Sequence, residues 1–486
     1  MKRIKFFSGI VVLMGATLIG CNKEEAVEKI PYGEIPDMIF RDYLLVHFDT
    51  DMDGFISVKE AQAVKEIDLS NKENVASLKG IEYFTSLERL NIRGVWRLEA
   101  LDLSNNLMLE VLDCSSSDGP NGEWNLSVTK NTNLKELYCS NMQTKTLDLS
   151  KNTALEILFC NNNPFLETLD LSNNKRLRIF NCSYTPLNLN SFRFDEYQYL
   201  EEFYNVHPYR IAAIDLSISN LPLRVIQCNY VGNMNINNLP DLEHLSIGFQ
   251  YEAIHALNLT KSTKLKSLSL TFINCDIDIS NCTALEELTW TSLHPVDISN
   301  NRALKYLYYA TPNILDISNN TALETVQFRS RQGTIPSFKN NTSLKNVWID
   351  LKEGVKHDFS NNPLIENLVL TGYRYSTGDF SNEIDIDHCT NLVDLMISDC
   401  YIDTLDVRNM SKLKIVTIGN CDSLSVINAS NLQHLESFKV MNNYKSNPIE
   451  ADFSYCTKLQ ELSLPQIKSL NLTGCNSLGG WSNYPR

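Results

Sequence analysis

The sequence has few of the residues that transition-metal sites and hydrolytic centres require. Its 486 residues include only 8 histidines, and these never fall at spacings that bring several ligands to one metal ion. The motifs H-E-x-x-H and G-x-S-x-G, which mark zinc proteases and serine hydrolases, are both absent. Paired acids such as Glu286 and Glu287 suit glycosidase chemistry, but neighbouring residues of a strand face opposite ways. We therefore expect a protein that is not an enzyme.

Positive charge is also scarce. The chain has 43 lysine and arginine residues against 58 aspartate and glutamate residues, a net charge of −15. Nucleic-acid binding needs a cationic surface that neutralises phosphates, so we expect no nucleic-acid partner. Glycine and proline, at 19 and 15 residues, are too few to indicate disorder over most of the chain.

The first residues have the charge and length of a secretory signal. Lys2, Arg3 and Lys5 precede an apolar run over residues 6–19. The same run is short for a membrane anchor, because the hydrocarbon core of a bilayer is about 30 Å thick. Export therefore explains the segment better than a transmembrane helix does.

The apolar run ends in Leu18-Ile19-Gly20-Cys21, which resembles the bacterial lipobox. That resemblance implies a signal peptide over residues 1–21 and acylation of Cys21. The alternative is an ordinary signal peptide with a chance cysteine. The following Asn-Lys-Glu-Glu looks like the export signal of certain Gram-negative surface lipoproteins. We expect a tether over residues 22–35 and a lipid anchor in the outer membrane, facing the exterior.

A helical cap with a calcium loop is expected over residues 36–66. Phe40, Leu44 and Phe48 fall on one face of a helix that begins near Asp37. The next twelve residues match every defined position of an EF-hand loop, in which alternate oxygens point to one calcium ion. The alternative is an acidic turn without a metal. The expected ligands are Asp49, Asp51, Asp53, the carbonyl of Phe55, Ser57 and Glu60.

A second feature of the same loop is a capping box. Ser57 and Glu60 stand three residues apart before an apolar stretch, so a helix is expected from Val58 to about Ile67. Only one loop is present, which favours a calcium ion that orders the cap over one that signals.

Three successive segments between Leu126 and Cys182 are close copies of one another. They read LSVTKNTNLKELYC, LDLSKNTALEILFC and LDLSNNKRLRIFNC, and the equivalent residues Val128, Leu149 and Leu171 lie 21 and then 22 positions apart. This period is typical of leucine-rich repeats. Similar strings recur from residue 67 onward, so we expect one solenoid over residues 67–486. Each coil should give one strand of a parallel β-sheet and an extended second leg.

The repeats resemble those of bacterial leucine-rich-repeat surface proteins, including the internalins, whose repeats follow a helical cap related to the EF-hand. The likeness covers residues 36–486. The segment L-D-L-S-x-N departs from internalin repeats and predicts an extended leg, not a 3₁₀ turn, on the convex side. The resemblance implies adhesion or recognition of a protein or glycan at the cell surface. The alternative is a non-catalytic scaffold or accessory subunit of an outer-membrane complex.

Thirteen cysteines are present, but none form a C-x-x-C pair. Buried cysteine behaves as a small apolar residue, so free structural thiols are favoured over cross-links. Five cysteines occupy the second inward site of L-x-x-L-x-C and should stack in the core: Cys114, Cys139, Cys160, Cys182 and Cys228.

The concave face carries aromatic residues at positions that should point outward from the strands. Exposed aromatics in a contiguous stripe usually mark a binding surface. The alternative is that irregular coils turn several of them inward, or that they only support the strands. The candidate ligand-binding residues are Tyr138, Phe159, Tyr184, Tyr204, His207, Tyr230, Phe249, Phe272, Tyr308 and Trp348.

Overall fold

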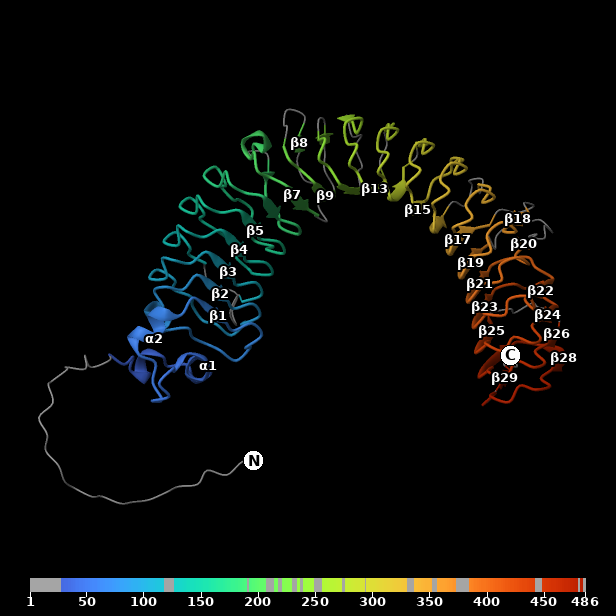
Figure 1. Ribbon diagram of the computed structural model, residues 1–486, viewed down its shortest axis with the longest axis horizontal. Helices are drawn as coiled ribbons and strands as arrows, with labels where there is room; N and C mark the ends of the chain where they lie inside the picture. Colours follow the sequence, from blue (N-terminus) through green and yellow to red (C-terminus); the bar gives the residue numbers. More distant parts are fainter. Residues whose placement is uncertain are drawn as a thin grey trace, which may run out of the picture.

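The structure is a computed structural model. It describes residues 28–117, 126–189, 192–206, 214–216, 221–229, 234–236, 239–248, 256–272, 276–292, 294–329, 336–351, 356–372, 384–441, 448–479 and 481–483. In this part of the chain, coil follows coil around an open arc, with the helices at one end and the last strands at the other (Figure 1). None of the helices in these ranges is long and apolar enough to cross a membrane.

The inner side of the arc is one parallel sheet of 20 strands (Figure 1). Each coil adds one strand, and along each strand the side chains alternate between the core and the inner surface. The strands are β1 (Glu66–Asp68), β2 (Arg89–Asn91), β3 (Val111–Asp113), β4 (Glu136–Tyr138), β5 (Ile157–Phe159), β6 (Ile179–Asn181), β7 (Glu202–Asn205), β9 (Val225–Asn229), β11 (His244–Gly248), β13 (Ser267–Thr271), β14 (Glu287–Thr291), β15 (Tyr306–Tyr309), β16 (Thr325–Phe328), β17 (Asn346–Asp350), β19 (Asn367–Thr371), β21 (Asp394–Ser398), β23 (Ile415–Gly419), β25 (Ser437–Met441), β27 (Glu461–Leu464) and β29 (Trp481–Asn483).

The outer side of the arc carries the second leg of each coil, which is extended as the sequence predicts. Where neighbouring legs pair, they form short parallel sheets of three, two and four strands. Two 3₁₀ turns, η2 (Ile81–Tyr83) and η4 (Phe194–Glu196), interrupt the pattern. The outer strands are β8 (Ile214–Leu216), β10 (Met234–Ile236), β12 (Ala256–Leu257), β18 (His357–Asp358), β20 (Ile384–Asp385), β22 (Thr404–Asp406), β24 (Val426–Asn428), β26 (Ile449–Asp452) and β28 (Ile467–Asn471).

The repeated L-D-L-S string is explained by a local hydrogen bond. In one coil, Asp148 Oδ1 accepts from the backbone N–H of Ser150 at 2.9 Å, which forms an Asx turn. This bond also lowers the pKa of the Asp148 carboxyl. The same bond fixes the start of the turn in coils whose aspartates are Asp68, Asp102, Asp170, Asp278, Asp297, Asp316, Asp358 and Asp452.

The asparagine that follows this string joins each coil to the one before it. Asn174 is fully buried, and its Nδ2 donates to the carbonyls of Leu149 and Asn152 at 3.1 and 2.8 Å. Where asparagine is replaced, a smaller donor takes its place, as in Cys282, whose Sγ bonds the carbonyl of Leu259 at 3.7 Å. Seven other asparagines each bond two backbone carbonyls in this way: Asn106, Asn131, Asn152, Asn301, Asn320, Asn341 and Asn362.

A row of charged residues, the charge ladder, runs along the edge of the inner sheet. Each member is the residue immediately before an inner strand, and acidic and basic members largely alternate from coil to coil. Glu243, for example, is ion-paired with Arg224 at 2.8 Å and with Lys266 at 2.7 Å, and these two cations hold the pKa of its carboxyl at about 2. The row reads Lys65, Glu88, Glu110, Lys135, Glu156, Arg178, Glu201, Arg224, Glu243, Lys266, Glu286, Lys305, Glu324, Lys345 and Glu366.

Reversing one charge in this ladder is expected to destabilise the solenoid. In Glu243→Lys, three cations would stand side by side, and each lost exposed pair is worth roughly 1 kcal/mol at most. We expect a lower urea midpoint, with a deficit that shrinks as salt is added because salt screens the repulsion. The neutral variant Glu243→Gln should lose less stability than Glu243→Lys. An unchanged midpoint in Glu243→Lys at low salt would show that the ladder contributes nothing.

The first coil is covered by two helices. Helix α1 (Met38–Phe48) begins at Asp37, whose Oδ1 accepts from the backbone N–H groups of Ile39 and Phe40 at 2.9 Å. Its residues Phe40 and Leu44 are fully buried. Helix α2 (Val58–Ala63) starts with the predicted capping box but is shorter than predicted, because Glu66 already belongs to β1.

The described part of the segment expected to be a tether packs onto this cap. Ile30 and Ile35 are each only 2% exposed. Between them, η1 (Tyr32–Glu34) makes one 3₁₀ turn. Lys29 forms an isolated antiparallel bridge with Ser57. Residues 28–35 are therefore part of the folded cap, which differs from the boundary at residue 36 that the sequence suggests.

Candidate functional site

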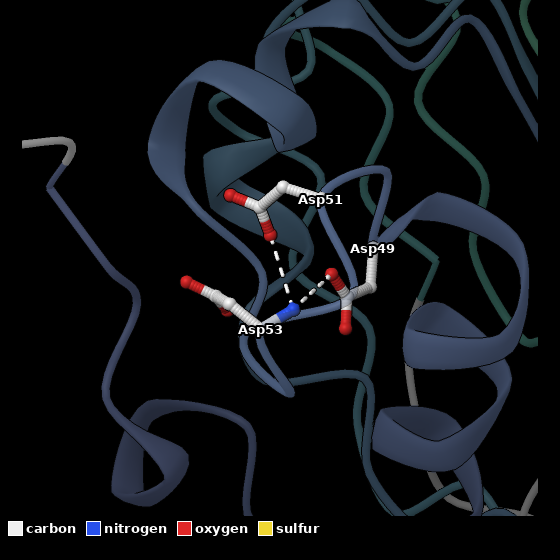
Figure 2. Close-up of side chains that lie close together, drawn as sticks. All are labelled: Asp49, Asp51 and Asp53. Carbon is white, nitrogen blue, oxygen red and sulfur yellow. Dashed lines mark hydrogen bonds between the residues drawn. The ribbon is translucent and has the colours of Figure 1, made fainter. Parts of the chain in front are cut away.

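Three carboxylates converge on one point of the loop between α1 and α2 (Figure 2). One oxygen from each of Asp49, Asp51 and Asp53 lies within 4.8 Å of the others. The backbone N–H of Asp53 donates to Asp49 and to Asp51, both at 3.2 Å, and the N–H of Gly54 donates to Asp49 at 2.9 Å. Gly54 has a φ of +82°, which explains the glycine at this turn. These bonds fold the loop so that its acidic groups face one another.

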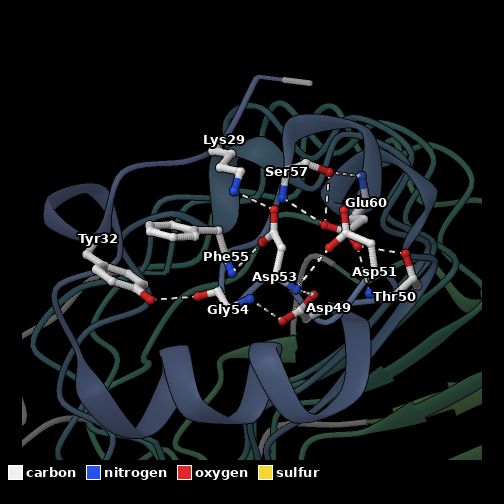
Figure 3. Close-up of polar contacts among 10 residues, drawn as sticks. All are labelled: Lys29, Tyr32, Asp49, Thr50, Asp51, Asp53, Gly54, Phe55, Ser57 and Glu60. Carbon is white, nitrogen blue, oxygen red and sulfur yellow. Dashed lines mark hydrogen bonds and ion pairs between the residues drawn. The ribbon is translucent and has the colours of Figure 1, made fainter. Parts of the chain in front are cut away.

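The other predicted ligands lie beside this trio, and two of them, Ser57 and Glu60, are bonded to each other (Figure 3). Glu60 Oε1 accepts from the backbone N–H and the hydroxyl of Thr50, both at 2.6 Å, and Oε2 accepts from the N–H and hydroxyl of Ser57, both at 2.9 Å. Partial burial pushes the pKa of Glu60 upward, but these four bonds outweigh burial and bring it to about 2. Phe55 donates its backbone N–H to Asp53 at 2.9 Å. A cleft of about 580 Å³ opens beside Asp51 and Glu60.

Residues 28–32 contact the loop, and Lys29 pairs with Ser57 at the start of α2. The ammonium of Lys29 lies 2.5 Å from Asp53 Oδ2 and 4.6 Å from the centre of the Phe55 ring (Figure 3). Tyr32 donates its hydroxyl to the carbonyl of Gly54 at 2.6 Å and stacks on Phe55 with ring centres 4.7 Å apart. The backbone N–H of Ile30 donates to the carbonyl of Ile56 at 2.9 Å, and the N–H of Val58 donates to the carbonyl of Glu28 at 2.8 Å.

The sequence interpretation missed Lys29 and Tyr32 because they were assigned to the tether. The available signal was the pair of apolar residues Ile30 and Ile35, which a solvated tether does not need. Their burial shows that the preceding chain packs against the cap that holds the acidic loop.

On the inner sheet, five of the candidate aromatics lie where the sequence places them. Tyr138, Phe159 and Tyr204 occupy equivalent positions on β4, β5 and β7. Tyr308 and Trp348 occupy that same row on β15 and β17. All five are half-buried and face the inner surface. The rings of Tyr138 and Phe159 lie 5.3 Å apart.

Two further candidates, Tyr184 and Phe272, lie in the turns after β6 and β13. Both have left-handed backbone conformations, with φ of +57° and +58°. Their side chains are 51% and 59% exposed. The candidates His207, Tyr230 and Phe249 lie outside the described residues. The same turn position in other coils is held by small polar residues with positive φ: Ser116, Asn141, Asn162, Asp399 and Asn420.

No protein-family model and no curated protein matches this chain. Among solved structures, it is similar to the functional domain of InlJ from Listeria monocytogenes, which includes a cysteine ladder. The two are 22% identical, the similarity covers 79% of this chain and 80% of that one, and the TM-score is 0.57. A TDR receptor is 17% identical with a TM-score of 0.51, covering 85% of this chain and 82% of that one. The internalin InlF from Listeria monocytogenes is 18% identical with a TM-score of 0.42, covering 81% of this chain and 98% of that one. The fold is a leucine-rich-repeat solenoid.

This leucine-rich-repeat solenoid also has stacked cysteines in its core. The 11 cysteines that belong to the described residues form no disulfide with one another, and all but Cys475 are buried. Burial raises the pKa of the stacked thiols well above the ordinary value. The stack consists of the five cysteines expected from the sequence: Cys114, Cys139, Cys160, Cys182 and Cys228.

The stacked thiols are expected to resist alkylation in the native protein. A thiolate is the reactive form of cysteine, and burial here disfavours it as well as blocking access. With iodoacetamide, Cys475 should be modified first, because it alone of the described cysteines is partly exposed. The five stacked residues should react only after unfolding in urea. Rapid modification of Cys139 or Cys160 in the native protein, read by peptide mass spectrometry, would contradict this.

Proposed function

We propose that this protein recognises another protein through the inner face of its solenoid and the adjoining turns. The observation that carries this proposal is the pair of exposed aromatics Tyr184 and Phe272. A left-handed conformation costs a residue with a side chain about 1–2 kcal/mol, and neither ring gains burial in return. Strain kept at an exposed aromatic is typical of functional positions, and large aromatics are the usual anchors of protein interfaces.

Further support comes from the shape and the chemistry of the inner face. The sheet curves around an open concavity (Figure 1). Aromatics of β4, β5 and β7 project from it next to the turn that holds Tyr184. Half-buried, well-supported rings can bind with little loss of side-chain entropy. The net charge of −15 favours partners with basic surfaces.

The experiment is capture of a partner from surface extracts of bacteria and of candidate host cells, comparing the wild type with Tyr184→Asn and Phe272→Asn. Asparagine is the residue that Asn141 and Asn162 supply at the same turn position, so the fold should keep or gain stability. We expect the variants to lose most of the captured protein while their melting temperatures do not fall. Equal capture by wild type and both variants would refute the proposal, and enrichment of glycans without protein would replace it with carbohydrate recognition.

We also propose that the loop between α1 and α2 binds calcium and thereby orders the cap. A hard cation prefers six to eight oxygens, and Asp49, Asp51 and Asp53 already supply converging carboxylates. Glu60 and Ser57 stand beside them as further oxygen donors. The bound ion would neutralise groups that otherwise repel one another. The cap touches the first coils through Tyr43, whose hydroxyl accepts from Asp68 N–H at 3.1 Å, so ordering it supports the solenoid end.

Finally, we propose that the protein is a lipoprotein held in the outer membrane through Cys21. The lipobox-like Leu18–Cys21 and the charged residues that follow support this. In a Gram-negative expression host, the chain should incorporate labelled palmitate and fractionate with membranes. The Cys21→Ala variant should lose the label, and wild-type protein without label would contradict the anchor.

A further inference from the structure

The inner surface of β4 to β7 carries a box of side chains with a repeated pattern. These four strands are consecutive in the sheet. The first row of the box consists of Glu136, Ile157, Ile179 and Glu202. The second row consists of Tyr138, Phe159, Asn181 and Tyr204. Between the two tyrosine–glutamate pairs the box therefore has a floor two strands wide, made of Ile157, Phe159 and Ile179 with the polar Asn181 at its fourth position.

Each tyrosine holds its glutamate in place. The Tyr138 hydroxyl donates to Glu136 Oε2 at 3.0 Å, and the Tyr204 hydroxyl donates to Glu202 Oε2 at 2.8 Å. Burial, together with the neighbouring carboxylate, raises the pKa of both tyrosines to about 12, so the phenols stay protonated and donate at all physiological pH values. Each tyrosine thus restrains one oxygen of its glutamate.

Neither carboxylate has a cation of its own among the described residues. The ladder members beside the box, at the edge of the sheet, are already paired, and Arg89 stands in the same row as Glu136 but two strands away, on β2. Lys135 is bound to Glu110 at 2.8 Å, and Arg178 is bound to Glu201 at 3.1 Å. A ligand that covers the box must bring positive charge, because burying an uncompensated carboxylate is costly.

The distance between the carboxylates of Glu136 and Glu202 matches a residue spacing in an extended peptide. Three interstrand distances separate β4 from β7, roughly 14 Å at 4.7–4.9 Å each. An extended peptide rises about 3.3–3.4 Å per residue, so residues i and i+4 are roughly 13 Å apart. Residues i, i+2 and i+4 of such a peptide also point to the same side. The side chain at i+2 would then lie over Ile157, Phe159 and Ile179.

From this match, and resting on the proposed recognition role of the inner face, we propose that β4 to β7 bind an extended segment of a partner protein with the pattern basic–x–apolar–x–basic. The two basic side chains pair with Glu136 and Glu202. The apolar side chain covers the floor formed by Ile157, Phe159 and Ile179. The peptide backbone runs across the strands, along the axis of the solenoid.

Synthetic capped peptides test the pattern directly. Lys-Ser-Phe-Ser-Lys should bind the purified protein more tightly than Lys-Lys-Ser-Phe-Ser, which has the same composition with adjacent charges, and Glu-Ser-Phe-Ser-Glu should not bind. Glu136→Gln and Glu202→Gln should each weaken binding of the first peptide by about fivefold, as expected for one ion pair of this exposure. Phe159→Ala should weaken it as well. Adding salt should reduce the differences between wild type and the glutamine variants.

Glu287→Gln is the matched control, since Glu287 lies in the same row on β14 but outside the box. It should bind the peptide as the wild type does, and all variants should have the melting temperature of the wild type. Equal affinity for both lysine peptides, or unchanged affinity in the Glu136 and Glu202 variants, would overturn the inference. If partner capture depends on Tyr184 and Phe272 but not on the box, the proposed function stands and this inference fails.

Discussion

Asn174→Ala is expected to lower the stability of the solenoid by roughly 1–3 kcal/mol, because two buried hydrogen bonds worth about 0.5–1.5 kcal/mol each are lost. Each carbonyl keeps a backbone donor, the N–H of Asn152 for Leu149 and the N–H of Leu155 for Asn152. Asn174 is fully buried and bonds the carbonyls of Leu149 and Asn152 in the preceding coil. The loss should weaken the junction between these two coils. Urea unfolding followed by circular dichroism measures the effect.

The neighbouring residue supplies the control. Asn173 is exposed, so Asn173→Ala should leave the urea midpoint nearly unchanged. Asn174→Cys should cost less than Asn174→Ala, because Cys282 and Cys456 already bond a carbonyl at this position. Equal midpoints for Asn173→Ala and Asn174→Ala would show that the asparagines do not hold the coils together. A repeat protein can unfold in parts, so an early phase confined to one region would also fit the junction role.

Calcium is expected to stabilise the cap by about 2.7 kcal/mol when its concentration is 100 times the dissociation constant. The physical reason is the convergence of Asp49, Asp51 and Asp53, which a cation relieves. Extracellular calcium modules bind with dissociation constants of about 10⁻⁴–10⁻³ M, and the proposed surface location leads us to expect a value in this range. Calorimetric melting with calcium or with a chelator measures the shift, and isothermal titration measures the affinity.

The Asp51→Asn variant should lose most of the calcium-dependent shift, whereas Lys59→Met, a change in α2 near the loop, should keep it. Lys29→Met should bind calcium more tightly, because the Lys29 ammonium pairs with Asp53 at 2.5 Å. Acid should also weaken the cap. The depressed pKa of Glu60 means that its contribution is complete above its ordinary value near 4.5 and is lost as the pH falls towards about 2. A melting temperature that does not respond to calcium would contradict the proposal that the loop binds calcium and orders the cap.

Much of the architecture follows from the sequence because each coil repeats the same local physics. Strings such as LDLSKNTALEIL fix an Asx turn at Asp148, a buried donor at Asn152 and an inward leucine at Leu158. The acidic loop also follows from the sequence, because the spacing of Asp49, Asp51 and Asp53 before Gly54 puts three carboxylates on one short turn, where they lie close together.

Other features depend on contacts between distant residues and could not be predicted in this way. The packing of residues 28–35 on the cap arises from tertiary contacts such as Tyr32 with Phe55. The charge ladder becomes visible only once the register of the strands shows that Arg224, Glu243 and Lys266 are neighbours. The left-handed turns at Tyr184 and Phe272 were not predicted either, because an aromatic there contradicts local preference.

A hydrogen-exchange footprint of a captured partner on this protein tests the central claim most directly. Recognition by the inner face predicts that the partner slows exchange in β4 to β7 and in the turn that holds Tyr184, while the outer strands β22, β24, β26 and β28 exchange as in the free protein. Slowed exchange confined to the outer strands, with the inner sheet unaffected, would contradict it.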